Sequence, residues 1–158
     1  MIKSIFTINL IIFPFWFVNG QDIGEPLSDW QPGTMDLHHI HTGRGDASFY
    51  VLPDGTSMLL DAGDMSEANP RITSPRNSRM KPDDSKTAGE WIVDYIHQFH
   101  PKKEDAVLDY AVITHFHDDH FGEIDHTSKK SAWGDYFISG LTEIGEHILI
   151  KKYIDRAY

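Results

Sequence analysis

Three histidines and two aspartates lie within six positions of the segment THFHDDHFG (114–122), directly after the apolar pair Val112–Ile113. Imidazole and carboxylate groups are ligands for zinc, manganese and iron, and the chain has no cysteine to offer a thiolate. His115 and His117 alternate with Phe116, so in an extended segment both imidazoles can point to the same side. The spacing therefore favours a metal site.

Asp119 and His120 follow at the start of a tight turn, which would bring a second pair of ligands close to the first. Two divalent ions that share a hydroxide would supply a nucleophile at neutral pH and stabilise negative charge on a reacting substrate. We therefore expect two divalent ions, with zinc preferred and manganese or iron as alternatives. The competing interpretation is a solvated, histidine-rich loop after a strand.

The elements that must position this segment can be read from its surroundings. Apolar runs rich in β-branched and aromatic residues predict strands at 34–42, 47–53, 56–63 and 108–114. The last run is nearly continuous, which is typical of a strand buried on both faces. Asp54-Gly55 separates the second and third runs and indicates a hairpin turn.

A helix is predicted between the third and fourth strands. Thr87 and Glu90 have the spacing of a capping box, apolar residues follow at helical intervals, and Pro101 ends the pattern. Residues 64–86 have the composition of a surface loop, residues 126–140 are also loop-like, and residues 141–158 fit either a helix or a short strand.

This order of elements indicates an α/β fold. In such folds, ligands gather beyond the carboxyl ends of neighbouring strands. The run SMLLD ends at Asp61 and the run YAVIT is followed by His115. If these two strands are neighbours in the sheet, Asp61 lies beside the histidine cluster.

These motifs resemble the metallo-β-lactamase-like hydrolase superfamily. THFHDDHFG is similar to its His-x-His-x-Asp-His signature, and MLLDAG (58–63) is similar to its strand ending in Asp-x-Gly. The stretch HIHTGRGDASFYVLPDGTSMLLDAGD (39–64) resembles the opening of the metallo-β-lactamase-like domain in bacterial DNA-uptake (competence) proteins and their secreted relatives. The resemblance runs from Met35 to Gly122 and implies an αββα sandwich, of which residues 34–158 would form largely the N-terminal half.

The resemblance also implies roles for individual residues. His115 and His117 would bind the first ion, and Asp119 and His120 would bind the second. Asp61 would lie behind these ligands and orient them, as the imidazoles of metal sites usually require. Asp119 and Asp61 would thus be the carboxylates of the catalytic centre.

The family takes further ligands from later strands, and this chain does not match that part of the pattern. After Gly122 it offers only His126 and His147, and neither has the Gly-His-Ser/Thr context of the family. The sequence therefore predicts an N-terminal fragment of such a domain. Weak metal binding and feeble or absent catalysis by this chain alone are expected.

The loop Gly43-Arg44-Gly45-Asp46 precedes the predicted hairpin. By the resemblance, Arg44 and Asp46 would contact substrate beside the ions, and His41 at the end of the preceding strand is a further substrate-binding candidate. A tight turn that needs glycine is the simpler interpretation and is compatible with this role. An Arg-Gly-Asp adhesion motif is a third, weaker interpretation.

Residues 1–20 have a lysine, an apolar stretch and a small residue in the order typical of a secretory signal peptide, and residues 21–33 form a lead-in segment. We therefore expect a secreted or periplasmic protein that is not held in the membrane after cleavage. The chain carries 14 basic and 24 acidic side chains, a net charge of −10. Such a charge disfavours long nucleic acids and favours a small substrate.

The sequence as a whole predicts an exported, dinuclear metal-dependent hydrolase that acts on a phosphodiester or another ester-like substrate. The preference for a phosphodiester rests on the resemblance alone. The alternative is a non-catalytic exported module that binds metal, or a remnant without activity.

Overall fold

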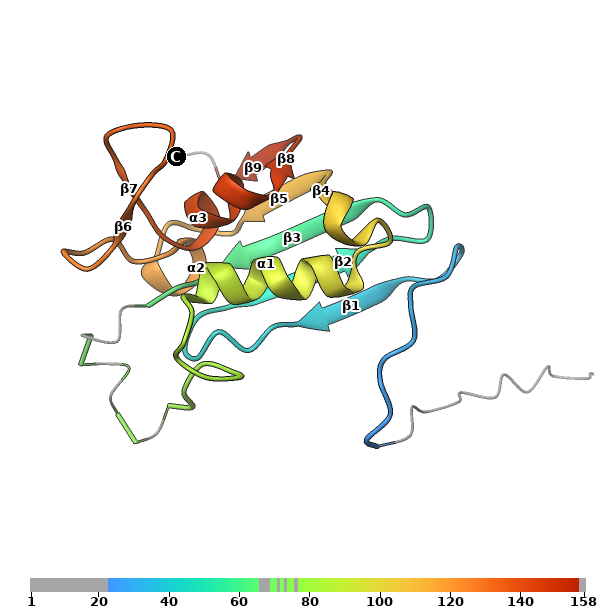
Figure 1. Ribbon diagram of the computed structural model, residues 1–158, viewed down its shortest axis with the longest axis horizontal. Coiled ribbons are helices and arrows are strands. Elements are labelled where there is room, and N and C mark those ends of the chain that lie inside the picture. The colour runs from blue at the N-terminus through green and yellow to red at the C-terminus, as the bar shows by residue number, and fades with distance from the viewer. Residues whose placement is uncertain (1–22, 66–68, 71, 73, 76, 157–158) are drawn as a thin grey trace, which may run out of the picture.

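The computed structural model of the chain describes residues 23–65, 69–70, 72, 74–75 and 77–156. These residues form a mixed α/β structure, as predicted, with one five-stranded sheet, two small sheets and three α-helices (Figure 1). The large sheet contains, in spatial order, β1 (Asp36–His39), β2 (Ala47–Val51), β3 (Ser57–Ala62), β5 (Tyr110–Ile113) and β9 (Tyr153–Asp155). The small sheets pair β4 (Val107–Leu108) with β8 (Leu149–Ile150), and β6 (Lys129–Lys130) with β7 (Phe137–Ile138). The helices are α1 (Ala88–Phe99), α2 (Asp118–Phe121) and α3 (Gly140–His147), and a 3-10 turn, η1, spans Lys103–Asp105.

The large sheet has an antiparallel half and a parallel half. β1, β2 and β3 form an antiparallel meander, and the predicted hairpin turn closes through a hydrogen bond of 2.8 Å from the Leu52 amide to the Thr56 carbonyl. β3 runs parallel to β5, with Leu60 opposite Val112, and β5 runs parallel to β9. The carboxyl ends of β3 and β5 therefore meet at one edge of the sheet.

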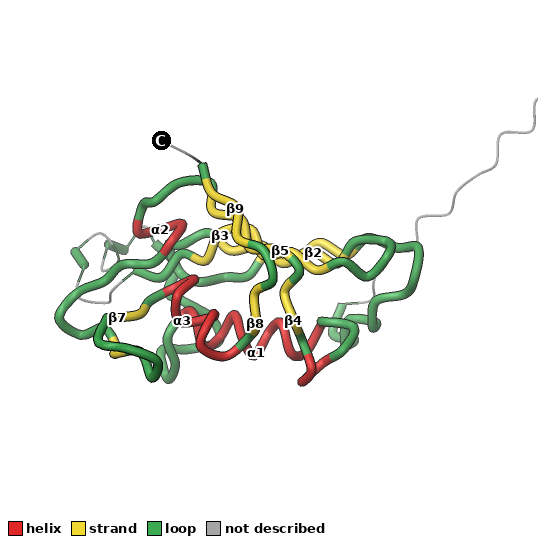
Figure 2. Tube along the Cα trace, turned by 90° about the horizontal axis from the view of Figure 1, so that it is seen from above, coloured by secondary structure: helices red, strands yellow, loops and turns green. Residues whose placement is uncertain are grey.

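The hydrophobic core lies on one face of this sheet. Figure 2 shows α1 and α3 together on that side. Alternate strand residues point toward the two helices, and the fully buried side chains include Phe49, Leu59, Ile92, Ile96, Leu108, Ile113 and Ile144. Burial of each such side chain stabilises the fold by about 1.5–3 kcal/mol. Neither α1 nor α3 covers the opposite face of the sheet.

The prediction of a strand at 108–114 buried on both faces is wrong. Strand pairing is interrupted at Asp109, whose carboxylate accepts a hydrogen bond of 2.9 Å from the Ser57 amide. β5 then begins at Tyr110, and its residues alternate between buried and half-buried. Tyr110 and Val112 lie on the face that the two long helices leave open, so an apolar sequence here does not mean burial on both sides.

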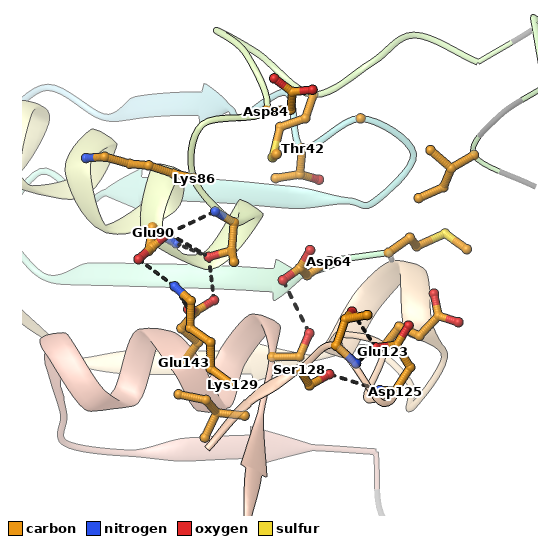
Figure 3. Close-up of a pocket in the computed structure, with 18 of the residues that line it drawn as sticks. Thr42, Asp64, Asp84, Lys86, Glu90, Glu123, Asp125, Ser128, Lys129 and Glu143 are labelled. Carbon is orange, nitrogen blue, oxygen red and sulfur yellow. Dashed lines mark hydrogen bonds and ion pairs between the residues drawn. The ribbon is translucent and has the colours of Figure 1, made fainter. Parts of the chain in front are cut away.

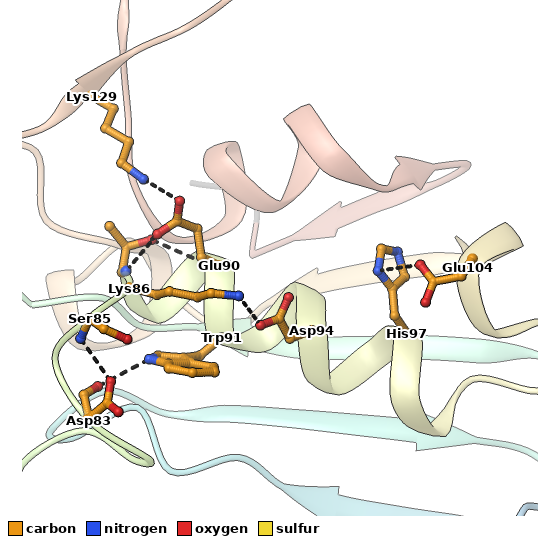
Figure 4. A network of polar contacts seen from close by, with 10 residues as sticks. Asp83, Ser85, Lys86, Glu90, Trp91, Asp94, His97, Glu104 and Lys129 are labelled. Carbon is orange, nitrogen blue, oxygen red and sulfur yellow. Dashed lines mark hydrogen bonds and ion pairs between the residues drawn. The ribbon is translucent and has the colours of Figure 1, made fainter.

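Helix α1 begins and ends where the sequence predicts. Thr87 caps it, and the capping box with Glu90 is complete. Lys129 donates to the Glu90 carboxylate at 2.6 Å, and Trp91 donates from its indole nitrogen to the Asp83 carbonyl at 3.1 Å. Contacts from β6 and from the loop before α1 therefore hold the first turn (Figure 4). The helix ends at Phe99, before Pro101.

The remaining predictions concern segments with weaker patterns. The sequence of 141–158 fits a helix or a strand, and the described part contains both. α3 runs on to His147, and β8 and β9 follow it. The described part of 64–86 contains neither helix nor strand before α1, and residues 126–139 hold only the short β6 and β7. The signal peptide predicted at 1–20 lies outside the described residues. Among the described residues, no helix has the length and apolar character needed to cross a membrane.

His38 is held in an aromatic environment beside the core. Its ring lies 4.9 Å from the ring of Phe99 and 5.8 Å from that of Phe49, and its Nδ1 is 3.2 Å from the Tyr95 hydroxyl. Its Nε2 is buried, and no partner for it lies among the described residues. This burial lowers the pKa of His38 from its usual value, and the nearby Asp36 carboxylate partly opposes the shift.

We predict that His38 makes the fold sensitive to acid. Because the neutral imidazole is favoured in the folded chain, its contribution is complete above the unfolded-state pKa of about 6.5 and is lost as the pH falls below it. His38→Phe should therefore lose less thermal stability than the wild type between about pH 7.5 and 5.5. Some dependence should remain, because burial also lowers the pKa of His100.

The measurement is the unfolding temperature by circular dichroism across this pH range. His39→Gln is the matched control, since His39 is exposed and its ring contacts only the Ser48 hydroxyl among the described hydrogen bonds. Equal pH dependence in the wild type and His38→Phe would contradict the prediction.

Candidate metal centre

The carboxyl ends of β3 and β5 bring Asp61 next to Thr114, as the sequence predicts for neighbouring strands. Oδ1 of Asp61 accepts from the Thr114 amide at 2.8 Å, and Oδ2 accepts from the Thr114 hydroxyl at 2.8 Å. Asp61 is only 5% exposed. Its carboxylate is therefore fixed at the end of the sheet.

The same carboxylate orients His120. Nδ1 of His120 lies 2.9 Å from Oδ2 of Asp61. The other ring nitrogen, Nε2, lies 3.7 Å from Oδ2 of Asp46 and 3.9 Å from Oδ1 of Asp119. A carboxylate that holds one imidazole nitrogen while the other faces further acidic groups is the usual arrangement behind a metal-binding histidine.

His115, Asp119 and His120 together form a group that could hold a metal ion, since each offers a ligand atom within 4.8 Å of the other two. The rings of His115 and His120 lie 4.0 Å apart. Helix α2 produces this arrangement, because its single turn curls the chain back after His117, with the amides of His120 and Phe121 donating to the His117 carbonyl. Three of the four ligands predicted from the sequence are thus brought together.

His117, the fourth predicted ligand, lies at the margin of this group. Its ring contacts that of His115 edge to face, with centroids 4.5 Å apart, and its side chain is exposed. It is not among the three residues whose ligand atoms lie mutually close. Its assignment to an ion together with His115 stays a prediction.

The three residues predicted to bind substrate lie at different distances from the group. Asp46 is adjacent to it, through the 3.7 Å approach to His120. Arg44 lines a separate cavity. His41 is exposed, and its Nδ1 accepts a hydrogen bond of 3.1 Å from the Gly43 amide, within its own loop.

Two glycines allow three backbone segments to meet beside the group. The Asp46 amide donates to the Asp119 carbonyl at 2.8 Å, and the Gly63 amide donates to the Asp46 carbonyl at 2.9 Å. A Cβ atom on Gly63 would collide with the Asp119 carbonyl, and one on Gly45 would collide with the backbone of Gly63. The segments therefore approach as closely as only glycine permits.

A polar cavity of about 560 Å³ lies near the first turns of α1 and α3 (Figure 3). Asp64 lines it and accepts a hydrogen bond of 3.3 Å from the Ser139 hydroxyl. Burial, followed by repulsion from Glu143, raises the pKa of Asp64 above its usual value. Glu143 is 2% exposed and accepts from the Thr87 hydroxyl at 2.6 Å and from Lys129 at 3.1 Å.

Sequence reasoning did not single out Asp64 or Glu143. Glu143 is buried and Asp64 half-buried where segments distant in sequence meet at this cavity, so no local pattern could identify them. His115, Asp119 and His120 are not among its lining residues. The cavity and the group of His115, Asp119 and His120 are therefore separate features.

Comparison of the chain with protein-family models, with curated proteins and with solved structures gave no match.

We predict that Gly63→Ala destabilises the chain by at least about 2 kcal/mol, because overpacking against a fixed backbone cannot be relieved by a rotamer change. The measurement is urea-induced unfolding monitored by fluorescence. Gly145→Ala is the matched control, since a Cβ there meets only Ile150 Cδ1 at 3.8 Å. The prediction is wrong if both alanine variants unfold at the same urea concentration.

Proposed function

We propose that the chain is an exported metal-dependent hydrolase related to the metallo-β-lactamase-like superfamily, with weak activity on phosphodiester or other ester-like substrates. The observation that carries the proposal is the group of His115, Asp119 and His120 at the carboxyl ends of two adjacent strands, with Asp61 behind it. The resemblance of THFHDDHFG and MLLDAG to the motifs of that superfamily supports the same function.

The donor set fits a divalent ion of the first transition series. Two imidazoles and a carboxylate suit zinc, with manganese or iron as alternatives, and the chain provides no thiolate because it lacks cysteine. His115, Asp119 and His120 would hold one ion, and we propose that His117 contributes to a second. The ions would supply an activated water and neutralise charge on the substrate.

The surrounding residues would position these ligands. Asp61 holds the imidazole of His120 through Nδ1, and Thr114 in turn holds Asp61 through two hydrogen bonds. The substrate is expected to meet the exposed loop that carries Arg44 and Asp46. The mixed sheet with both long helices on one face agrees with one half of an αββα sandwich, which is the architecture that we propose.

A second candidate function is a metal-binding module without catalysis. One observation favours it: His117 lies outside the group of mutually close ligand atoms, so the described residues bring together ligands for one ion and not for the two that the proposed hydrolase would use. Three protein ligands with an open position for water are the usual set of a catalytic zinc ion, so the group by itself is compatible with either function.

We predict that the 158-residue chain takes up zinc and hydrolyses bis(p-nitrophenyl) phosphate slowly. His120→Ala should lower zinc affinity at least about tenfold and abolish turnover, because it removes a ligand and leaves the Asp61 carboxylate without its imidazole partner. The measurements are calorimetric zinc titration and release of p-nitrophenol. His126→Ala is the control, since His126 is exposed and outside the group.

The outcomes separate the two candidate functions. Turnover that His120→Ala abolishes supports the hydrolase. Zinc uptake without turnover supports the binding module. If the wild type binds no zinc at micromolar concentration, neither function stands.

A further inference from the structure

The position of Asp46 suggests more than the substrate contact that its sequence motif indicates. Its loop folds back at the start of β2, where the Thr42 hydroxyl donates to the Gly45 carbonyl at 2.8 Å. The backbone of Asp46 is then fixed on both sides, by its amide to Asp119 and by its carbonyl to Gly63. The carboxylate consequently extends from a rigid backbone beside helix α2.

The Asp46 carboxylate lies near Nε2 of His120, the ring nitrogen that could bind a metal ion. Because Nδ1 of His120 is held by Asp61, Nε2 is the nitrogen on the side of Asp46 and Asp119. Oxygen atoms from these two aspartates lie 3.7 and 3.9 Å from Nε2. Two carboxylates therefore approach the same imidazole nitrogen from two different segments.

The distances can be compared with those of a coordination sphere. Bonds of about 2.0–2.2 Å in a tetrahedral zinc site place neighbouring ligand atoms about 3.3–3.6 Å apart. The separations at His120 Nε2 exceed this range by only a few tenths of an ångström. Asp46 is not among the described residues whose ligand atoms all lie within 4.8 Å of one another, so its 75% exposed side chain would have to rotate toward His115 and Asp119 to bind the same ion.

We propose that Asp46 is a fourth protein ligand, completing with His115, Asp119 and His120 a site for one divalent ion of the zinc class. This inference rests on the metal binding that both candidate functions require. Four protein ligands fill a tetrahedral zinc ion and leave no position for water, so it favours the metal-binding module over the hydrolase. It would add a ligand from the loop between β1 and β2. Two imidazoles and two carboxylates also balance the two charges of the ion.

The simpler interpretation is an ion pair between the exposed Asp46 carboxylate and a protonated His120. Such a pair contributes little to stability and nothing to metal binding. The two interpretations differ in what the carboxylate does when an ion is present. Replacement of Asp46 by asparagine distinguishes them, because it removes the charge while the backbone hydrogen bonds to Asp119 and Gly63 do not involve the side chain.

The experiment is a calorimetric titration of zinc chloride into the 158-residue chain and its Asp46→Asn and Asp118→Asn variants. Asp118→Asn is the matched control, since it removes the same charge one residue from Asp119 but lies outside the metal-binding group. We expect Asp46→Asn to weaken zinc binding at least about tenfold, as loss of a ligand does. Asp118→Asn should change it less than about twofold, as a general charge effect does.

Cobalt provides a second readout that a structural role would not change. In the cobalt-loaded wild type, the visible absorption reports the number and type of ligands. Asp46→Asn should shift this spectrum, and Asp118→Asn should leave it unchanged. Equal zinc affinities and identical cobalt spectra for the two variants would overturn the inference while leaving the proposed function intact. A wild type that binds neither ion would overturn both.

Discussion

The carboxylate of Asp61 connects the sheet to the candidate metal-binding group, and the rest of the site depends on this connection. It accepts two hydrogen bonds from Thr114 and a third contact from His120, so one buried acid joins the ends of β3 and β5 to helix α2. Asp61 has a φ of +57°, a left-handed conformation that aspartate tolerates better than most residues. A buried carboxylate in a strained backbone persists only where its contacts compensate for that strain.

The glycines at 45 and 63 make the second constraint. They let the loop before β2, the end of β3 and the turn of α2 come within backbone hydrogen-bonding distance of one another. The Glu123 amide extends this contact by donating to the Asp64 carbonyl at 2.7 Å. Backbone hydrogen bonds therefore hold these segments together, and the positions from which the side chains of the site extend are fixed.

Periodicity and spacing predicted the parts of the site that lie on regular elements. The apolar runs before Asp61 and His115 marked two strands, and the parallel pairing of β3 with β5 brings their ends together as expected. Thr87 and Glu90 likewise marked the start of α1. Each of these predictions depends on local residue patterns, which the tertiary structure preserves.

The parts that the sequence could not predict depend on how loops fold. Helix α2 begins immediately after His117, so the chain curls back and groups His115 with His120, while an extended segment would have grouped it with His117. Asp46 reaches His120 only because its loop folds over Gly63. Val112 is apolar yet half-buried, because α1 and α3 pack on the other face of the sheet.

Negative charge is concentrated around His120. Carboxylates of Asp46, Asp61 and Asp119 all lie within 4 Å of one imidazole, in a chain whose net charge is already −10. Like charges gathered in this way repel one another unless a cation lies among them. An ion held by these groups would bind only the folded chain, because its ligands come from segments that separate on unfolding. At one hundred times its dissociation constant it would stabilise the fold by about 2.7 kcal/mol, so metal binding would be coupled to folding.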